Sequence, residues 1–300
     1  MKEVVFKRPD MEDREIIQLY FQKFPSRSCE LTFANILLWA RFYSVTYAII
    51  EDALVFRSVG KETMFTYPIG EKEDAKNALE FLKNYTKEQE IPLVLYNVTP
   101  EKFEELEELY PGQYEIEYNR DNADYVYETE KLATLSGKKL HAKRNHINKF
   151  KEIYPDWKYE AIDDSNIEEC FQMALSWCQK NGCREEEEKN AEMCVTLNSL
   201  RLFHELELKG GLIRVNGEII AFTIGEPINE DTFVVHIEKA FADMQGAYPM
   251  INQQFVEHEC RDYKYVNREE DTGAEGLRKA KLSYRPVFLV EKGLVKEKVQ

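Results

Sequence analysis

Short apolar stretches alternate with charged ones along the whole chain of 300 residues. Apolar positions three or four residues apart predict helices near 11–23 and within CELTFANILLWARFY. Apolar runs bounded by turn residues predict the strands VTYAII, ALVFRS, TMFTYP and PLVLYNV. A charged helix is expected over 72–90 and another over 100–110, where Pro100 suits a first helical turn. The strands YEIEY and DYVYE are expected to close this half.

The second half repeats this alternation. Ser165-x-x-Glu168 has the capping-box pattern and predicts the start of a helix, while NGCREEEEKN predicts a polar surface connection. Asn216-Gly217 is the pair that a type I′ turn requires, so LIRVNGEIIAFTIG predicts a β-hairpin. The expected order then continues with the strand TFVVHIEK, a helix with Pro249 at its first position, the strand YKYVN, a short helix at GLRKAK and the strand PVFLVEKG.

This order predicts an α+β protein in which each half has a mixed, largely antiparallel sheet flanked by helices. We expect domains at 1–135 and 136–300, with one domain of about 300 residues as the alternative partition. The apolar content of 43% is typical of a globular chain. The net charge of −15 disfavours non-specific adhesion to nucleic acid or anionic lipid, so a polyanion would need a local basic patch.

No targeting, membrane-spanning or metal-binding pattern is visible in the sequence. The N-terminal residues lack the apolar run of a secretory signal, and TFANILLWARFY contains Arg41 and is too short to cross a bilayer, which predicts a cytoplasmic protein. The six cysteines form no C-x-x-C pair and are expected to be reduced thiols. His141 and His146 are five residues apart and diverge on a helix, so no metal site is predicted.

The segment GKKLHAKRNHINKFK, residues 137–151, holds six Lys or Arg, two His and no acid. On a helix, Leu140, Ile147 and Phe150 form one apolar stripe. Lys143 lies inside that stripe, and Arg144 lies at its edge. A charge there must extend to solvent, find a partner or meet a ligand. Two readings therefore stay open: a snorkelling or salt-bridged lysine, and a site for an anion.

Two further features of the second half are candidates for chemistry. In TFVVHIEK, alternation puts His236 and Glu238 on one strand face, where they could take a proton from an amine nucleophile. A plain solvated face is the other reading. After this strand, a turn of small residues leads into a helix whose first N–H groups could hold phosphate oxygens. The residues of this turn are Gln245, Gly246, Ala247 and Tyr248.

Three segments resemble one protein family. GKKLHAKRNHINKF, NREEDTGAEGLRKAKLSYRP and SCELTFANILLWAR are similar to an uncharacterised bacterial family related to the C-terminal transferase domain of phosphatidylglycerol lysyltransferase, and distantly to Fem-type aminoacyl transferases. The resemblance implies tandem GNAT-like (acyl-CoA N-acyltransferase) domains with the active cleft in the second. It places Lys143, Arg144 and Asn145 near a phosphate-bearing ligand, with Lys149 as a further phosphate contact on the same helix. It also puts the 245–248 turn at the donor's phosphates, and Asn267, Arg278 and Lys281 near the cleft.

The resemblance implies a transferase that moves an acyl or aminoacyl group from acyl-CoA or aminoacyl-tRNA to an amine or hydroxyl, with no tightly bound cofactor. Many acetyltransferases have a Tyr two residues before the Lys of their final motif, and here Lys279 stands two residues before Lys281. This departure favours an aminoacyl ester over acetyl-CoA. Because no membrane region is visible, we expect a soluble amine or peptide as acceptor. The alternatives are a non-catalytic protein that binds tRNA on 138–151, and a structural role for that helix.

Overall fold

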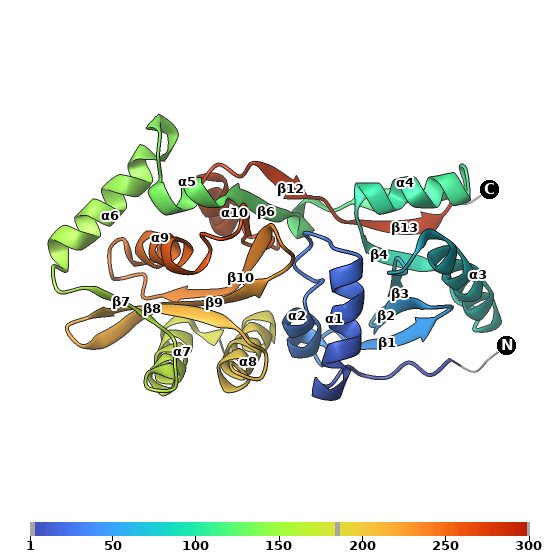
Figure 1. The fold of residues 1–300 in the computed structure, drawn as a ribbon, viewed down its shortest axis with the longest axis horizontal. Helices are drawn as coiled ribbons and strands as arrows, with labels where there is room; N and C mark the ends of the chain where they lie inside the picture. Colours follow the sequence, from blue (N-terminus) through green and yellow to red (C-terminus); the bar gives the residue numbers. More distant parts are fainter. Residues whose placement is uncertain (1–3, 184–186, 299–300) are drawn as a thin grey trace. The chain divides into compact units, whose positions relative to one another are not determined.

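The computed structural model describes residues 4–183 and 187–298, which divide into two compact units. Unit 1 comprises Met1–Ala123 and Val290–Gln300, and unit 2 comprises Asp124–Leu289. Each unit has its own mixed β-sheet flanked by helices (Figure 1). No helix within the described ranges is both long and apolar enough to cross a bilayer.

Unit 1 has a six-stranded sheet in the order β1-β2-β3-β4-β13-β5. Its strands are β1 (Val45–Ile50), β2 (Ala53–Val59), β3 (Thr63–Thr66), β4 (Val94–Val98), β5 (Tyr114–Tyr118) and β13 (Gly293–Glu297). Its helices are η1 (Met11–Asp13), α1 (Arg14–Lys23), α2 (Phe33–Trp39), α3 (Lys72–Glu88), α4 (Pro100–Leu109) and η2 (Arg120–Asn122). All pairings are antiparallel except β3 with β4.

Unit 2 has a seven-stranded sheet in the order β12-β6-β11-β10-β9-β8-β7. Its strands are β6 (Asp124–Glu128), β7 (Lys158–Ala161), β8 (Lys209–Val215), β9 (Glu218–Pro227), β10 (Thr232–Ala240), β11 (Tyr265–Asn267) and β12 (Phe288–Val290). Its helices are α5 (Thr129–Thr134), η3 (Lys138–Leu140), α6 (His141–Ile153), α7 (Ile167–Asn181), α8 (Glu187–Arg201), α9 (Ala247–Glu259) and α10 (Glu275–Leu282). β10 pairs in parallel with β11 and antiparallel with β9.

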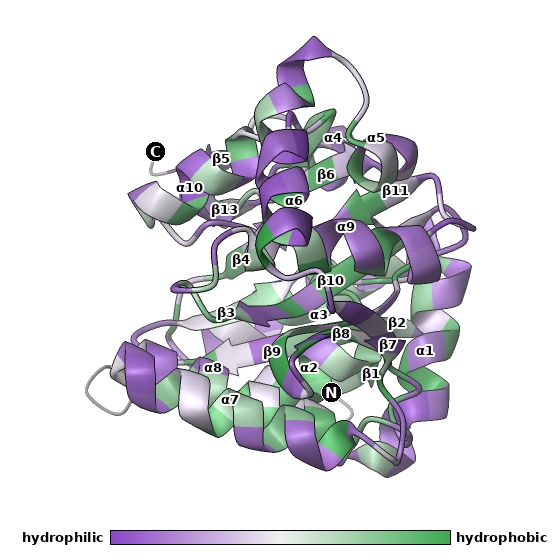
Figure 2. Cartoon of the chain, turned by 90° about the vertical axis from the view of Figure 1, so that its left-hand side faces the viewer, coloured by the Kyte–Doolittle hydropathy of each residue, from purple (hydrophilic) through white to green (hydrophobic). Residues whose placement is uncertain are grey.

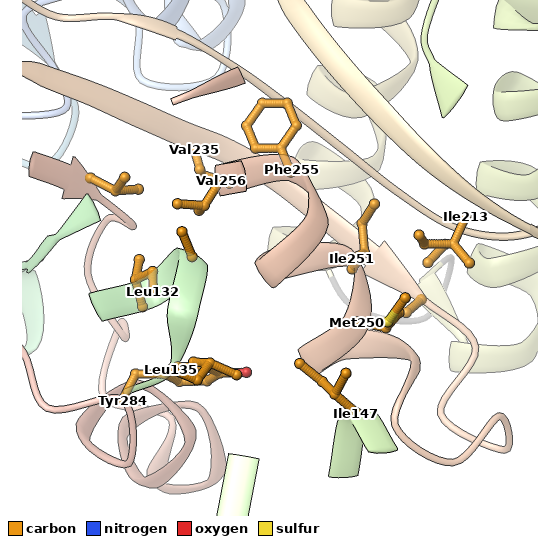
Figure 3. Close-up of a cluster of buried hydrophobic side chains, with 14 of the residues drawn as sticks. Leu132, Leu135, Ile147, Ile213, Val235, Met250, Ile251, Phe255, Val256 and Tyr284 are labelled. Atoms are coloured by element: carbon orange, nitrogen blue, oxygen red, sulfur yellow. The ribbon is translucent and has the colours of Figure 1, made fainter. Parts of the chain in front are cut away.

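The two faces of the unit 2 sheet carry different helices. α9 lies on one face against β8, β9 and β10, and α5 and α6 pack on α9, whereas α7 packs on the other face (Figure 1). The buried cluster around α9 includes Ile147 from α6, Leu132 from α5 and Tyr284 after α10 (Figure 3). Fully burying each large apolar side chain stabilises the fold by about 1.5–3 kcal/mol. This cluster therefore fixes the position of α6 on α9.

The domain boundary in the structure differs from the expected division at 135/136. β6 was expected to close the first half, but it pairs with β11 in the unit 2 sheet. β13 comes from the end of the chain, yet it pairs with β4 and β5 in unit 1. The local sequence pattern does not show which sheet a strand joins, because strand pairing depends on residues far apart in the sequence.

Several helix boundaries also differ from expectation. α7 begins at Ile167 with Asn166 as its N-cap, and Ser165 instead donates to Asp163, so the expected capping box is absent. Pro249 is the third residue of α9, not the first. α8 was not predicted; part of NGCREEEEKN, residues 184–186, lies outside the described residues. The hairpin turn is confirmed, because Asn216 and Gly217 both have positive φ, at 51° and 84°.

Candidate functional site

The helix α6 presents its apolar stripe to the core, as the sequence predicted. Ile147 and Phe150 are 3% and 0% exposed, and the rest of α6 is predominantly hydrophilic (Figure 2). Gly246, the N-cap of α9, approaches this helix so closely that an added Cβ would lie 2.6 Å from the His146 carbonyl oxygen. Its φ of 85° also favours glycine. The glycine is therefore required by packing between α6 and α9, whatever else the turn does.

Lys143 lies one helical turn before Ile147 and is half-buried. Its Nζ is 4.0 Å from the centroid of the Tyr284 ring, a cation–π distance. No described residue forms a hydrogen bond or ion pair with this ammonium. Burial, reinforced by the charge of Arg268 and opposed by Glu238, lowers the pKa of Lys143 to about 8. The lysine is not salt-bridged, and its partner among the described residues is the Tyr284 ring, so a role in ligand binding stays a prediction.

Glu238 on β10 is the centre of a polar group inside unit 2. Arg268, directly after β11, donates from Nη2 to both carboxylate oxygens at 3.0 and 3.1 Å. Asn252 on α9 donates from Nδ2 to Oε2 at 3.2 Å. The Arg268 guanidinium lies over two rings, 4.9 Å from the Tyr284 centroid and 5.8 Å from that of Tyr127. Lys143, Glu238, Arg268, Asn252 and these tyrosines are called the Glu238 cluster below.

The Glu238 cluster retains hydrogen-bonding capacity that no described residue uses. Arg268 Nη1 and Asn252 Oδ1 are both buried and lack a hydrogen-bond partner. Buried polar groups are nearly always paired, so an unpaired one requires an explanation. Burial tends to lower the pKa of Arg268, but Glu238 outweighs it and raises that pKa, so the guanidinium remains a charged donor. The cluster thus offers two charged donors, the Arg268 guanidinium and the Lys143 ammonium, and one neutral acceptor, Asn252 Oδ1.

His236 and Glu238 do not share a face of β10, contrary to the alternation expected from the sequence. The register shifts between Val235 and Ile237, so that a β-bulge includes His236. His236 instead contacts Glu269 through Nδ1 at 2.7 Å and Glu226 through Nε2 at 3.0 Å. The extra residue reverses the alternation, so Glu238 falls on the side of Val235 and α9.

His236 is held in its charged form. Burial alone would lower its pKa, but the hydrogen bonds to Glu226 and Glu269 outweigh burial and raise the pKa to about 10. A histidine protonated at neutral pH cannot accept a proton. Both ring nitrogens of His236 already have hydrogen-bond partners within the protein, so neither is left for a ligand.

Three residues assigned to substrate binding from the final motif make internal contacts. Asn267 is fully buried, donates to Asp124 at 3.0 Å and accepts from the Glu269 N–H at 2.7 Å. Arg278 forms two 2.8 Å hydrogen bonds with Asp271, which lower the pKa of that carboxyl. These contacts shape the loop after β11.

Lys281 also forms hydrogen bonds with this loop. Its Nζ donates to the Arg268 carbonyl oxygen at 2.6 Å and also to the Glu270 carbonyl oxygen. Burial lowers the pKa of Lys281. The motif NREEDTGAEGLRKAKLSYRP therefore forms a hydrogen-bonded loop followed by α10, and it contributes Arg268 and Tyr284 to the Glu238 cluster. The sequence reasoning missed Arg268.

The other predicted residues of α6 lie away from the Glu238 cluster. Arg144 donates to the carbonyl oxygens of Leu135 and Gly137, the latter at 2.8 Å, and so caps the end of α5. Asn145 contacts His141 at 3.2 Å and Lys149 pairs with Glu152 at 3.2 Å, both on the exposed side. Of the basic residues on this helix, the structure brings Lys143 to the cluster.

The turn expected at the donor's phosphates is partly buried. Gln245 is exposed, Ala247 is 1% exposed and Tyr248 is intermediate. Burial raises the pKa of Tyr248. The charge of Glu238 contributes to this rise, and the phosphate role of the turn stays a prediction.

Comparison with known proteins gives a consistent result. Residues 21–295 match the family model described as phosphatidylglycerol lysyltransferase, C-terminal. A conserved protein of unknown function from Bacteroides thetaiotaomicron is 40% identical, with a TM-score of 0.93 and coverage of 99% of this chain and 100% of that one. An uncharacterised protein of Mycoplasmoides gallisepticum is 27% identical over 190 residues, covering 62% of this chain and 60% of that protein's length.

Two more distant solved structures share the fold. The C-terminal domain of a putative lysylphosphatidylglycerol synthetase from Agrobacterium fabrum is 14% identical, with a TM-score of 0.68 over 96% of this chain and 92% of that chain. L-PGS from Bacillus licheniformis is 15% identical, with a TM-score of 0.66 over 100% and 95% of the two chains. The chain belongs to the family of phosphatidylglycerol lysyltransferase C-terminal domains.

Proposed function

We propose that this protein transfers an acyl or aminoacyl group from a phosphate-bearing donor, aminoacyl-tRNA or acyl-CoA, to an amine or hydroxyl acceptor. Family membership supports group transfer, and the Glu238 cluster supplies the groups that such a transfer needs. We also propose that each unit is a GNAT-like domain and that unit 2 is the catalytic one. The protein would act in the cytoplasm without a tightly bound cofactor.

The observation that carries the proposal is that Arg268 Nη1 is buried and has no hydrogen-bond partner among the described residues, while Lys143 lies half-buried in the same cluster. When a nucleophile attacks an ester carbonyl, negative charge develops on the carbonyl oxygen. Preorganised donors in a water-poor site stabilise that charge far more than donors in water do. Arg268 Nη1 is such a donor, and its position is fixed by Glu238 and by the loop that Lys281 holds.

Proton transfer is assigned to two residues of the cluster. The acceptor nitrogen or oxygen attacks the carbonyl carbon, the bond from that carbon to the ribose oxygen or CoA sulfur breaks, and one acceptor proton passes to the leaving atom. Lys143, with a pKa of about 8, donates to the leaving atom as an ammonium. Glu238 takes the acceptor's proton, since His236 is already protonated. The turn at 245–248, of which Gln245 is exposed, is proposed to contact the donor's phosphates.

The test is single-turnover transfer from labelled aminoacyl-tRNA or acyl-CoA in the presence of amine and alcohol acceptors. The proposal expects label to leave one donor, and expects Arg268→Met to reduce the rate by at least about 100-fold. R261M is the matched control, because Arg261 is an exposed arginine of unit 2 that pairs with Glu130 and Glu257, outside the Glu238 cluster. A wild-type protein that turns over no donor in the panel would refute the proposal.

A second candidate function is binding of tRNA without chemistry. It is favoured by the exposed basic residues of 138–151, among them Lys138, Lys139 and Lys149. Nucleic-acid affinity that falls linearly in log salt, and that drops in a K138A/K139A variant, would support this function. Absence of retention at low salt would remove it.

A further inference from the structure

The end of α7 contains a pair of cysteines that the proposed function does not use. Cys178 and Cys183 are five residues apart, a spacing that puts two side chains on different faces of a continuous helix. The helix does not continue between them, because α7 ends at Asn181 and Gly182 is left-handed, with φ 64° and ψ 31°. The Gly182 N–H donates to the Cys178 carbonyl oxygen, which is the bond of an αL C-cap. Such a cap turns the chain back over the last helical turn, so Cys183 returns to Cys178.

The two thiols are in contact but differ in their chemistry. Their side chains form a hydrogen bond with each other, and Cys178 is 9% exposed whereas Cys183 is 1% exposed. Burial, together with the hydrogen bond and the charge of Cys178, raises the pKa of Cys183 to about 11, and the charge of Lys239 opposes this rise. Cys183 therefore keeps its proton at neutral pH. An oxidant that reaches the pair meets Cys178 first, and Cys183 is placed to react second.

The residues beside this pair hold the segment that connects β10 to α9. Trp177 directly precedes Cys178, and its Nε1 donates to the carbonyl oxygen of Ala240, the last residue of β10, at 3.0 Å. Lys180, also on α7, has its Nζ 3.3 Å from Asp243 Oδ2. A covalent bond brings two sulfurs closer together than a hydrogen bond does, so forming one moves at least one of the two side chains. Such a movement changes the end of α7 where it contacts this segment.

We propose that Cys178 and Cys183 are a reversible oxidation site, at which hydrogen peroxide forms a disulfide that alters the contacts of α7 with the segment between β10 and α9. In the first step, the Cys178 thiol R–SH and H2O2 give the sulfenic acid R–SOH and H2O. In the second, R–SOH and the Cys183 thiol R′–SH give the disulfide R–S–S–R′ and H2O. Two thiols are thus oxidised while one peroxide is reduced to two molecules of water. The proposal is independent of the transferase function, because its test requires no donor or acceptor.

The direct test is peptide mapping of the full-length protein after treatment with hydrogen peroxide. Trypsin cleaves after Lys180, so Cys178 lies in the peptide 159–180 and Cys183 in the peptide 181–184. We expect peroxide to join these two peptides with the loss of two hydrogen atoms, and dithiothreitol to separate them again. Peptides that stay unlinked, whether Cys178 remains a thiol or is oxidised to a sulfinic acid, would overturn the proposal.

C183S and C170S are the matched variants. Cys170 is fully buried on the same helix and lies in the same tryptic peptide as Cys178, so it is the alternative partner of Cys183. C183S should lose the linked peptide, whereas C170S should keep it. Fragmentation of the linked wild-type peptide identifies the bonded cysteine without any variant. A bond from Cys183 to Cys170 would contradict the assignment.

Trp177 fluorescence shows whether the disulfide alters the end of α7. The chain has three tryptophans, so W39F/W157F leaves Trp177 as the emitting residue. We expect peroxide to shift the emission of this variant, dithiothreitol to restore it, and the added C183S substitution to remove the shift. A linked peptide with unchanged emission would refute the effect on the contacts of α7. A shift that persists with C183S would refute the disulfide as its cause.

Discussion

Each side of β10 carries a group of charged and polar side chains. The two groups are similar in composition but differ in whether their hydrogen-bonding atoms are paired. On one side, His236 uses both ring nitrogens on Glu226 and Glu269. On the other, Glu238 is bonded to Arg268 and Asn252, and each of these two partners keeps one buried atom unpaired. A polar network whose hydrogen-bonding atoms are all paired stabilises the fold. A network with unpaired atoms can still form hydrogen bonds with a ligand. The difference supports a structural role for His236 and the proposed catalytic role of Glu238, although the sequence makes the two residues look alike.

The largest effect is expected from Arg268→Met. Removing one partner of a buried ion pair leaves Glu238 uncompensated, which should lower the free energy of unfolding by about 3–5 kcal/mol. Urea denaturation measures this loss. The double variant R268M/E238Q should recover part of the stability and none of the transfer. If R268M alone were fully stable, the ion pair would not be as important to the cluster as we infer.

His236→Asn should lower stability in a pH-dependent way. The folded pKa of about 10 lies above the ordinary value of 6.5, so the stabilisation is fully present below pH 6.5 and is lost as pH rises through 10. The difference in unfolding free energy between wild type and H236N should therefore be on the order of a few kcal/mol at pH 6 and small at pH 10. Transfer by the folded variant should stay within about threefold of wild type. A difference that does not change with pH would contradict the ionised His236.

Lys143→Met should reduce transfer about 100-fold, the usual size of a lost proton donor. The free energy of unfolding at pH 7 should change by less than about 1 kcal/mol, because methionine fits the apolar stripe and removes a half-buried charge. Since the donor must be protonated, the wild-type rate should fall above pH about 8, and K143M should lack that decline. K143M with a full rate and a strongly reduced stability would make Lys143 structural.

The smallest effects are expected at the exposed residues of α6. Asn145→Ala and Lys149→Ala should each change the free energy of unfolding by less than about 0.5 kcal/mol, because they lose one surface contact. Their transfer rates should also remain close to wild type. A large loss of tRNA affinity in K149A would instead support the basic surface as a binding site.

Much of the fold could be predicted from residues close in sequence. The hairpin at Asn216-Gly217 and most strand positions follow from turn chemistry and apolar spacing. The membership of β6 and β13 in their sheets could not be predicted this way, since it depends on partners such as Val266 and Leu95 far along the chain. The same holds for the β-bulge at His236, which no local residue signals and which reverses the alternation on β10.

The site was predictable where a polar residue interrupts an apolar stripe. Lys143 was found in this way, and Asn252 could have been, since it lies three and four residues before Phe255 and Val256. Arg268 gave no such signal, because it follows a three-residue strand and its burial comes from Tyr127 and Tyr284. Arg144 was placed near a phosphate-bearing ligand by the resemblance and by its position at the edge of the stripe, but it donates to the carbonyl oxygens of Leu135 and Gly137.

The most direct test of the distinction between the two sides of β10 is the single-turnover transfer rate of Glu238→Gln set beside that of His236→Asn, both at pH 7 and both shown to be folded. The account predicts that E238Q loses at least about 100-fold while H236N stays within about threefold of wild type. Equal losses, or a loss confined to H236N, would contradict it.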